Sequence, residues 1–167
     1  MNIKVERNYL EINSLKDLKT SKFFPDDCSI DLSDPADFQI NKFFYRSIGK
    51  EHRWTDRLVW TDKQWIEYIS NQKVKTYILK KVDDLAGYFE LIFHEEKKET
   101  EIAYLGLLKE YQSKKLGSFI LTSAIKNSFT NYTNRVWVHT CSLDHKHALN
   151  NYISRGMRIY KTESISV

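Results

Sequence analysis

The chain has few of the residues that build disulfide scaffolds, linkers or membrane spans. Its two cysteines, Cys28 and Cys141, lie far apart and have no metal-binding or redox spacing, which excludes a disulfide framework. Two prolines and five glycines among 167 residues exclude a low-complexity chain. No stretch approaches the roughly 18 apolar residues of a membrane span. The N-terminus lacks the apolar core of a signal peptide, so we expect a cytoplasmic protein with reduced thiols and no membrane partner.

An excess of one charge is also missing. The chain has 26 Lys and Arg residues against 22 Asp and Glu, which leaves a formal net charge of +4. Such a mild charge suits an anionic small ligand and does not call for nucleic acid. The length fits a single domain, residues 1–167, with a substantial core.

The most informative stretch runs from Glu101 to Gly117 and into the segment that follows. Residues 102–108 are apolar throughout and predict a strand buried on both faces. A polar turn over 109–113 leads into a helix predicted over 114–129. Such a turn directs free backbone N–H groups at one spot, which suits a phosphate, although a plain strand-turn-helix unit is the alternative. Gly117 costs about 1 kcal/mol relative to Ala in a helix, so a phosphate or a neighbouring strand is expected to approach it closely.

Other segments complete a single α/β pattern. A helix is predicted over 39–49, and Thr61 and Gln64 form a capping box that starts a second helix. A last helix over 145–155 has Asp144 as its expected N-cap and Gly156 as the residue that ends it. The remaining strands are predicted at 5–12, 28–32, 74–82, 85–93, 135–141 and 157–161.

Two motifs in this order of elements resemble the GNAT superfamily of acyl-CoA-dependent N-acyltransferases. The first is the family's pyrophosphate loop, Gln/Arg-x-x-Gly-x-Gly/Ala, which stands here as QSKKLG at residues 112–117. The second is Ala-x-x-x-Tyr-x-x-x-Gly-Phe, which stands here at residues 148–157 with Tyr152 and Gly156 in place. Both motifs together are more specific than either alone. The match covers roughly residues 43–163 and looks like a bacterial subgroup.

The resemblance implies a GNAT (acyl-CoA N-acyltransferase) fold, with a central mixed, mostly antiparallel twisted sheet of about seven strands flanked by about four helices. It implies a cofactor-binding core at about 74–163 and a helical acceptor-side segment at about 39–71. The implied activity is direct transfer of an acetyl group from acetyl-CoA to a primary amine, without a metal. The acceptor would be a small-molecule or protein amine, and the protein a monomer or homodimer.

The resemblance also assigns residues to the cofactor. The strand at Leu105 and Leu107 would pair with the pantetheine amides, and the amide at Leu107 would polarise the thioester. Asn150 or Asn151 would bond the pantetheine arm. The backbone of the loop and of the helix start would hold the diphosphate, through Gln112, Ser113, Lys114, Lys115, Leu116, Gly117 and Ser118. Lys115 departs from the pattern, because the family has a Gly there that lets the backbone approach the diphosphate.

Two carboxylates are candidates for the base that deprotonates the acceptor amine, whose pKa is near 10.4 in a Lys-like group. Glu101 lies at the offset before the first motif where some GNAT enzymes carry a glutamate base, and Glu90 lies on the neighbouring strand. A solvated Glu101 at a strand end is the other interpretation. His139 could act as a base through water, but an interior strand His with a backbone partner is the more common case. Tyr152 matches the family's general acid for the leaving thiolate.

Other functions stay open at this stage. A GNAT-like fold that binds acyl-CoA without catalysis is compatible with Lys115 in the Gly position. A nucleic-acid-binding module would use the basic aromatic segment 46–60, although acidic residues and the mild net charge argue against it. A thiol mechanism at Cys141 lacks an orienting group, and the spacing of His145 and His147 does not suit a metal.

Overall fold

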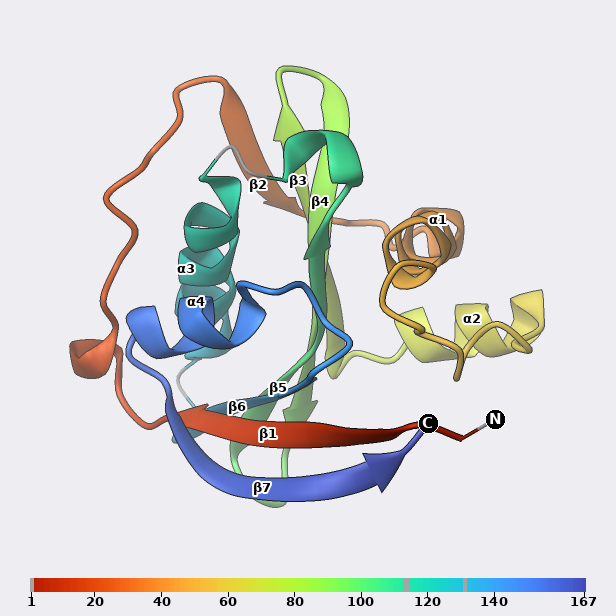
Figure 1. The fold of residues 1–167 in the computed structure, drawn as a ribbon. Helices are drawn as coiled ribbons and strands as arrows, with labels where there is room; N and C mark the ends of the chain where they lie inside the picture. The colour runs from red at the N-terminus through yellow and green to blue at the C-terminus, as the bar shows by residue number, and fades with distance from the viewer. Residues whose placement is uncertain (1, 113–114, 131) are drawn as a thin grey trace.

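One seven-stranded sheet forms the centre of the computed structural model, which describes residues 2–112, 115–130 and 132–167 (Figure 1). The strand order is β2-β3-β4-β5-β6-β1-β7. The strands are β1 (Lys4–Ile12), β2 (Cys28–Leu32), β3 (Val74–Lys81), β4 (Asp84–His94), β5 (Glu99–Leu107), β6 (Arg135–Cys141) and β7 (Arg158–Ser166). All neighbours are antiparallel except β5 and β6, which confirms the expected mixed, mostly antiparallel sheet.

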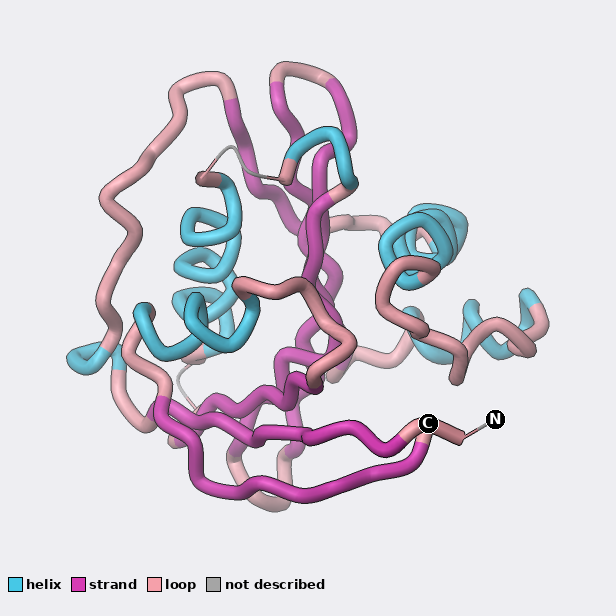
Figure 2. The backbone as a smooth tube through the Cα atoms, in the orientation of Figure 1, coloured by secondary structure: helices cyan, strands magenta, loops and turns pink. Residues whose placement is uncertain are grey.

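Helices cover both faces of the sheet (Figure 2). In the described part of the chain they are α1 (Phe38–Gly49), α2 (Asp62–Ile69), α3 (Leu116–Ser128) and α4 (Ala148–Ser154), with short 3-10 turns η1 (Leu15–Asp17) and η2 (Lys109–Tyr111). Helices α3 and α4 lie on one face, and α1 and α2 lie on the other. The capping box of α2 is present as predicted, because the Gln64 amide donates to Thr61 Oγ1 and the Thr61 amide donates to Gln64 Oε1.

The main core lies between the sheet and α3. The apolar stripe of α3 places Leu121 and Ile125 fully inside, against the sheet residues Leu10, Phe89 and Val136. Burial of each such side chain is worth roughly 1.5–3 kcal/mol, so this face fixes α3 firmly on the sheet. A smaller cluster under α1 has Phe44 stacked on Tyr88, with ring centroids 4.8 Å apart.

The sheet separates between β5 and β6. The two strands pair only over residues 99–101 and 135–137, although β5 continues to Leu107 and β6 to Cys141. A register shift against β4 leaves Ala103 as an extra residue in β5, a bulge that bends the strand. The prediction that residues 102–108 are buried on both faces was therefore wrong, because 103–107 are only half-buried where the strands diverge.

Element ends differ from the prediction in the second half of the chain. Helix α4 begins at Ala148, three residues later than expected, and its N-cap position is His147. Asp144 is not a helix cap, because its Oδ2 accepts a hydrogen bond from the Cys141 amide at the end of β6 (3.1 Å). Strand β7 is longer than expected and reaches Ser166, with β1 held between it and β6.

Candidate functional site

A cavity of about 1410 Å³ occupies the gap between β5 and β6. It is lined on one side of the sheet by α3 and α4, through Gly117 and Asn151, and on the other by the α1–α2 connection, through Trp54 and Asp56. Ligand pockets commonly have volumes of 300–1,000 Å³, so this cavity has room for an extended ligand and a second small molecule.

The loop that enters α3 has an unusual backbone conformation at Lys115. This residue lies directly before the helix with φ 62 and ψ 10, in the left-handed region, and its side chain makes no capping hydrogen bond. Left-handed geometry costs a non-glycine residue roughly 1–2 kcal/mol. The position where the family motif has Gly therefore keeps a conformation that Gly adopts easily. The predicted loop residues Ser113 and Lys114 lie outside the described residues.

The first turn of α3 faces the cavity through Gly117 and Ser118. A Cβ atom added at Gly117 would meet only Asn151 Nδ2, at an ordinary contact distance of 3.6 Å. No neighbouring strand therefore explains this Gly, and space for a ligand is the remaining expected reason. Leu116 differs from its neighbours, because its side chain is 1% exposed in the core and only its backbone is available to a ligand.

The edge of β5 that faces the cavity carries free backbone groups. The Leu108 amide donates to the Ala86 carbonyl (2.8 Å), and bonded pairs in an antiparallel ladder recur at every second position. Leu105 and Leu107 therefore turn their N–H and C=O groups away from β4, toward the gap. The Leu107 carbonyl accepts from Gln112 Nε2 (3.3 Å), which leaves the Leu107 N–H available. In the described chain no strand pairs with this edge beyond residue 101.

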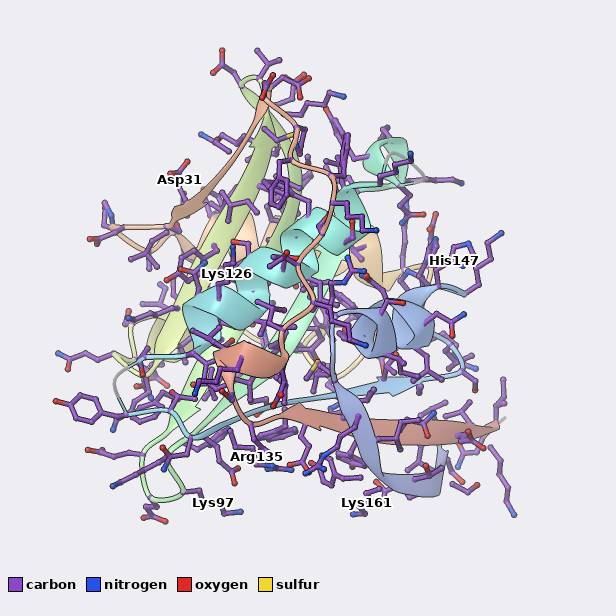
Figure 3. The ribbon with its side chains drawn as sticks, turned by 90° about the vertical axis from the view of Figure 1, so that its left-hand side faces the viewer. Asp31, Lys97, Lys126, Arg135, His147 and Lys161 are labelled. Carbon is purple, nitrogen blue, oxygen red and sulfur yellow. The ribbon has the colours of Figure 1, made fainter. Side chains whose placement is uncertain are left out.

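The segment between β1 and β2 passes over α3, and in Figure 3 it crosses in front of this helix, on which Lys126 is labelled. Ser21 fixes it there: its Oγ lies 2.8 Å from Ser118 Oγ, and its amide donates to Thr122 Oγ1 (2.9 Å). The Lys19 amide donates to the Arg155 carbonyl at the end of α4 (2.9 Å). The segment thereby brings Lys19 and Lys22 to the cavity beside α3, next to Arg155 at the end of α4. No sequence pattern predicts this arrangement, because the contacts are tertiary.

Tyr152 on α4 lines the cavity and is 7% exposed. Burial, and then the Asp144 carboxylate, raise the pKa of Tyr152 well above its ordinary value. The phenol therefore keeps its proton at neutral pH and is available as a donor. The two asparagines predicted to bond the pantetheine arm differ in their surroundings. Asn151 Nδ2 donates to the Gly117 carbonyl (3.0 Å), while Asn150 is exposed at the cavity.

The two candidate carboxylates lie in different surroundings. Glu101 lines the cavity where β5 and β6 separate, and its Oε1 lies 3.0 Å from His94 Nε2. Glu90 does not line the cavity and is fully buried. Its oxygens accept hydrogen bonds from Asn41 (2.8 Å), Tyr68 (2.9 Å) and Arg57 (2.9 and 3.2 Å). The geometry therefore favours Glu101 over Glu90 as a group that meets a substrate.

Arg57 forms the wall of the acceptor side, and its role was missed in the sequence. Only 7% exposed, it lies between aromatic rings, with its Cζ 4.2 Å from the Tyr68 centroid and 4.4 Å from that of Tyr104. Burial alone would lower the pKa of Arg57, but Glu90 and then Tyr68 raise it, so the guanidinium stays charged. A buried, paired Arg57 is not available to a nucleic acid.

The opposite wall comes from β1 and β6. Arg7, His139 and Cys141 line the cavity there. Burial, and then Arg7, lower the pKa of His139, so its imidazole is neutral at pH 7.

The described residues contain no group of three or more His, Cys, Asp or Glu side chains placed to hold a metal ion. In the same ranges, none of the helices is long and apolar enough to cross a membrane.

The sequence profile of the acetyltransferase (GNAT) family matches residues 38–157. The chain belongs to the GNAT acetyltransferase family. This match spans most of the chain and includes both motifs, the separation of β5 from β6 and the helix that carries Tyr152. No curated protein sequence matches the chain.

Solved structures show that the fold of this GNAT protein is the family's fold. A GCN5-related N-acetyltransferase from Kribbella flavida has a TM-score of 0.65 at 13% identity, over 99% of this chain and 58% of that one. A spermidine N-acetyltransferase from Vibrio cholerae in complex with CoA and spermine has a TM-score of 0.64 at 13% identity, over 86% and 96%. An aminoglycoside acetyltransferase from an uncultured soil metagenomic sample has a TM-score of 0.65 at 13% identity, over 77% and 87%.

This chain spans less than two thirds of the length of some of the solved structures that it resembles. The GNAT chain described in Figure 1 spans 58% of the Kribbella flavida protein and 61% of a functionally unknown protein from Staphylococcus epidermidis, which has a TM-score of 0.62 at 15% identity over 98% of this chain. At such low identity the likeness concerns the fold, with its seven-stranded mixed sheet and four helices in the described part.

Proposed function

We propose that this GNAT protein is an N-acetyltransferase that transfers an acetyl group from acetyl-CoA to a primary amine by direct attack. The observation that carries the proposal is the separation of β5 from β6, where a free strand edge leads from the start of α3 to Glu101 and Tyr152. The cofactor side corresponds to about 74–163 and the acceptor side to about 39–71, in one domain.

The cofactor-side residues suit acetyl-CoA. The first turn of α3 offers free N–H groups at Gly117 and Ser118, which favour a diphosphate, and Lys115 adds an exposed positive charge beside them. The edge at Leu105 and Leu107 offers strand-like partners for the pantetheine amides. Gln112 orients this turn through its hydrogen bond to Leu107, and Asn150 extends the polar lining. When bound, acetyl-CoA supplies the activated acetyl group.

Three groups divide the chemistry. Glu101 accepts the proton of the amine, directly or through water, and His94 holds its carboxylate in place. The Leu107 N–H stabilises the negative charge that develops on the acetyl oxygen. Tyr152 donates its proton to the departing sulfur. Glu90, the other predicted base, positions Arg57 and the acceptor-side wall instead.

The acceptor is an amine. Two structural relatives are named for amine substrates, an aminoglycoside and spermidine, which supports this class of acceptor. Two carboxylates that line the cavity can meet such a group, Glu101 on β5 and Asp56 on the α1–α2 connection.

Two measurements test this proposal: binding of the cofactor by thermal shift, and turnover by release of thiol from acetyl-CoA. Acetyl-CoA and CoA should raise the melting temperature, and thiol release from acetyl-CoA should depend on added amine. Tyr152→Phe should lower kcat by about 10²- to 10⁴-fold with little change in acetyl-CoA affinity, because it removes only the donated proton. Glu101→Gln should lower kcat to a similar degree. Absence of any thermal shift overturns the cofactor assignment, and binding without turnover of any amine favours a non-catalytic acyl-CoA-binding protein.

A further inference from the structure

Arg7 on β1 is a cation at the acceptor side of the cavity. In the described ranges it forms no ion pair, and its Nε is buried without a hydrogen-bond partner. Other arginines of the same face are satisfied, since Arg57 is bound to Glu90, and Arg135 is bound to Glu11 and Glu99. An Arg side chain has five N–H donors, so donors remain for a ligand.

The position of Arg7 in the sheet directs it to the acceptor side. Leu10 and Ile12 on β1 belong to the core under α3, and side chains alternate along a strand. Arg7 and Tyr9 therefore lie on the other face, which is the face of α1 and α2. There Arg7 lines the same cavity as Glu101.

The carboxylates near Arg7 already have other partners. Glu163 stands opposite Arg7 in the β1–β7 register, but its carboxylate accepts from Tyr9 Oη (2.6 Å) and pairs with Lys161 (3.3 Å). Glu101 is bound to His94. His139 beside them is neutral at pH 7 because burial and Arg7 lower its pKa. One guanidinium charge is therefore open to a ligand at a wall of the cavity.

We propose that the amine acceptor also carries an oxyanion, a carboxylate or a phosphate, which Arg7 binds while the amine reaches Glu101. This rests on the proposed N-acetyltransferase function. The planar guanidinium can bind either oxyanion through two parallel hydrogen bonds, and it would then fix the orientation of a small acceptor in the open half of the cavity. An amine with only positive or neutral groups would leave the Arg7 charge without a partner.

Matched pairs of acceptors test this. We would measure kcat/KM for lysine against cadaverine, and for phosphoethanolamine against ethanolamine, which differ by the carboxylate and the phosphate respectively. In at least one pair, the native protein should prefer the member that carries the oxyanion by about 10- to 100-fold, the range typical of a charge-assisted hydrogen bond. A preference in the first pair identifies a carboxylate, and one in the second identifies a phosphate.

The variant Arg7→Gln should remove the preference by raising KM for the member that carries the oxyanion, while kcat/KM for cadaverine and for ethanolamine changes much less. Arg7→Lys should keep part of it, because an ammonium is a point charge. Lys4→Gln is the matched control: it removes one charge from the same strand at an exposed position outside the cavity, and should keep the full preference.

Several results would overturn the proposal. These are acetylation of cadaverine and ethanolamine as efficiently as lysine and phosphoethanolamine, acetylation of cadaverine and ethanolamine alone, acetylation of none of the four, or a preference that survives Arg7→Gln. The proposed function stands in the first, second and fourth cases, because acetyl transfer is then observed. It fails separately if acetyl-CoA neither stabilises the protein nor releases thiol with any amine.

Discussion

At the scale of residues, Lys115 carries backbone strain at the edge of the cavity. Replacing it with Gly should raise the free energy of unfolding by about 1 kcal/mol, because Gly adopts φ 62 without the Cβ clash. For a chain of this size that corresponds to about 2–4 °C in melting temperature. Lys115→Ala is the control, since it removes the ammonium and keeps the Cβ. Equal melting temperatures for the two variants would contradict the strain.

Substitutions of Gly117 should affect the free energy of unfolding and the affinity for acetyl-CoA in opposite directions. Gly117→Ala should stabilise the unliganded protein by up to about 1 kcal/mol, because Ala is the better helix former and its Cβ meets only Asn151. The same methyl group should weaken acetyl-CoA binding, and Gly117→Arg should abolish it. Urea unfolding and calorimetric titration measure the two effects. Unchanged acetyl-CoA affinity in Gly117→Arg would show that the cofactor does not approach this turn.

At the scale of elements, Glu90 connects the acceptor-side helices to the sheet. Asn41 of α1, Arg57 of the α1–α2 connection and Tyr68 of α2 all donate to this one carboxylate of β4. The position of α1 and α2, and with it the acceptor wall, therefore depends on a buried ion pair.

Removing the Glu90 charge should leave Arg57 buried and uncompensated. Glu90→Gln should lower the free energy of unfolding by roughly 3–5 kcal/mol and raise KM for the amine more than KM for acetyl-CoA. The double variant Glu90→Gln/Arg57→Gln should recover part of the stability. Glu95→Gln, in an exposed pair with Lys73, should have no measurable effect. Stability of Glu90→Gln equal to that of Glu95→Gln would refute this role.

Local signals predicted most elements, and tertiary contacts decided the rest. The capping box at Thr61 and the alternation of residues 135–141 fixed α2 and β6 because both signals are local. Helix α4 begins late because Asp144 bonds back to β6, a contact that sequence spacing does not show. The apolar residues of β5 could not predict its half-buried edge. Pairing with β6 ends at Glu101, just before the bulge at Ala103, and sequence apolarity does not show where a strand loses its neighbour. Arg57 lay in a basic aromatic segment typical of a surface, and only its partner on β4 explains its burial.

The whole molecule should respond to alkaline pH through its buried tyrosines. Burial is the largest cause that raises the pKa of Tyr68, Tyr88, Tyr104 and Tyr152 above the ordinary value of about 10. The folded state therefore holds these protons more tightly than the unfolded chain, so this contribution to stability is complete below about pH 10 and is lost as pH rises above it.

Parallel titrations check this whole-molecule behaviour. Phenolate absorbance from these four tyrosines should appear together with the loss of circular dichroism. Tyr88→Phe should move the unfolding midpoint to higher pH, because it removes a buried hydroxyl that has no hydrogen-bond partner. Ionisation of every tyrosine before unfolding would show that these side chains are not sealed from solvent.

The place of β1 between β6 and β7 has a consequence for synthesis on the ribosome. Residues 4–12 leave the exit tunnel before the other six strands of the sheet, yet both of their partner strands lie within residues 135–166. The elements from β2 to α3 can pack against neighbours that are close in sequence before β6 and β7 are synthesised. During this time β1 has no partner strand on either of its hydrogen-bonding edges. Because contacts of such long sequence separation form slowly, docking of β1 should be the late step of folding, and the waiting strand a target for chaperones.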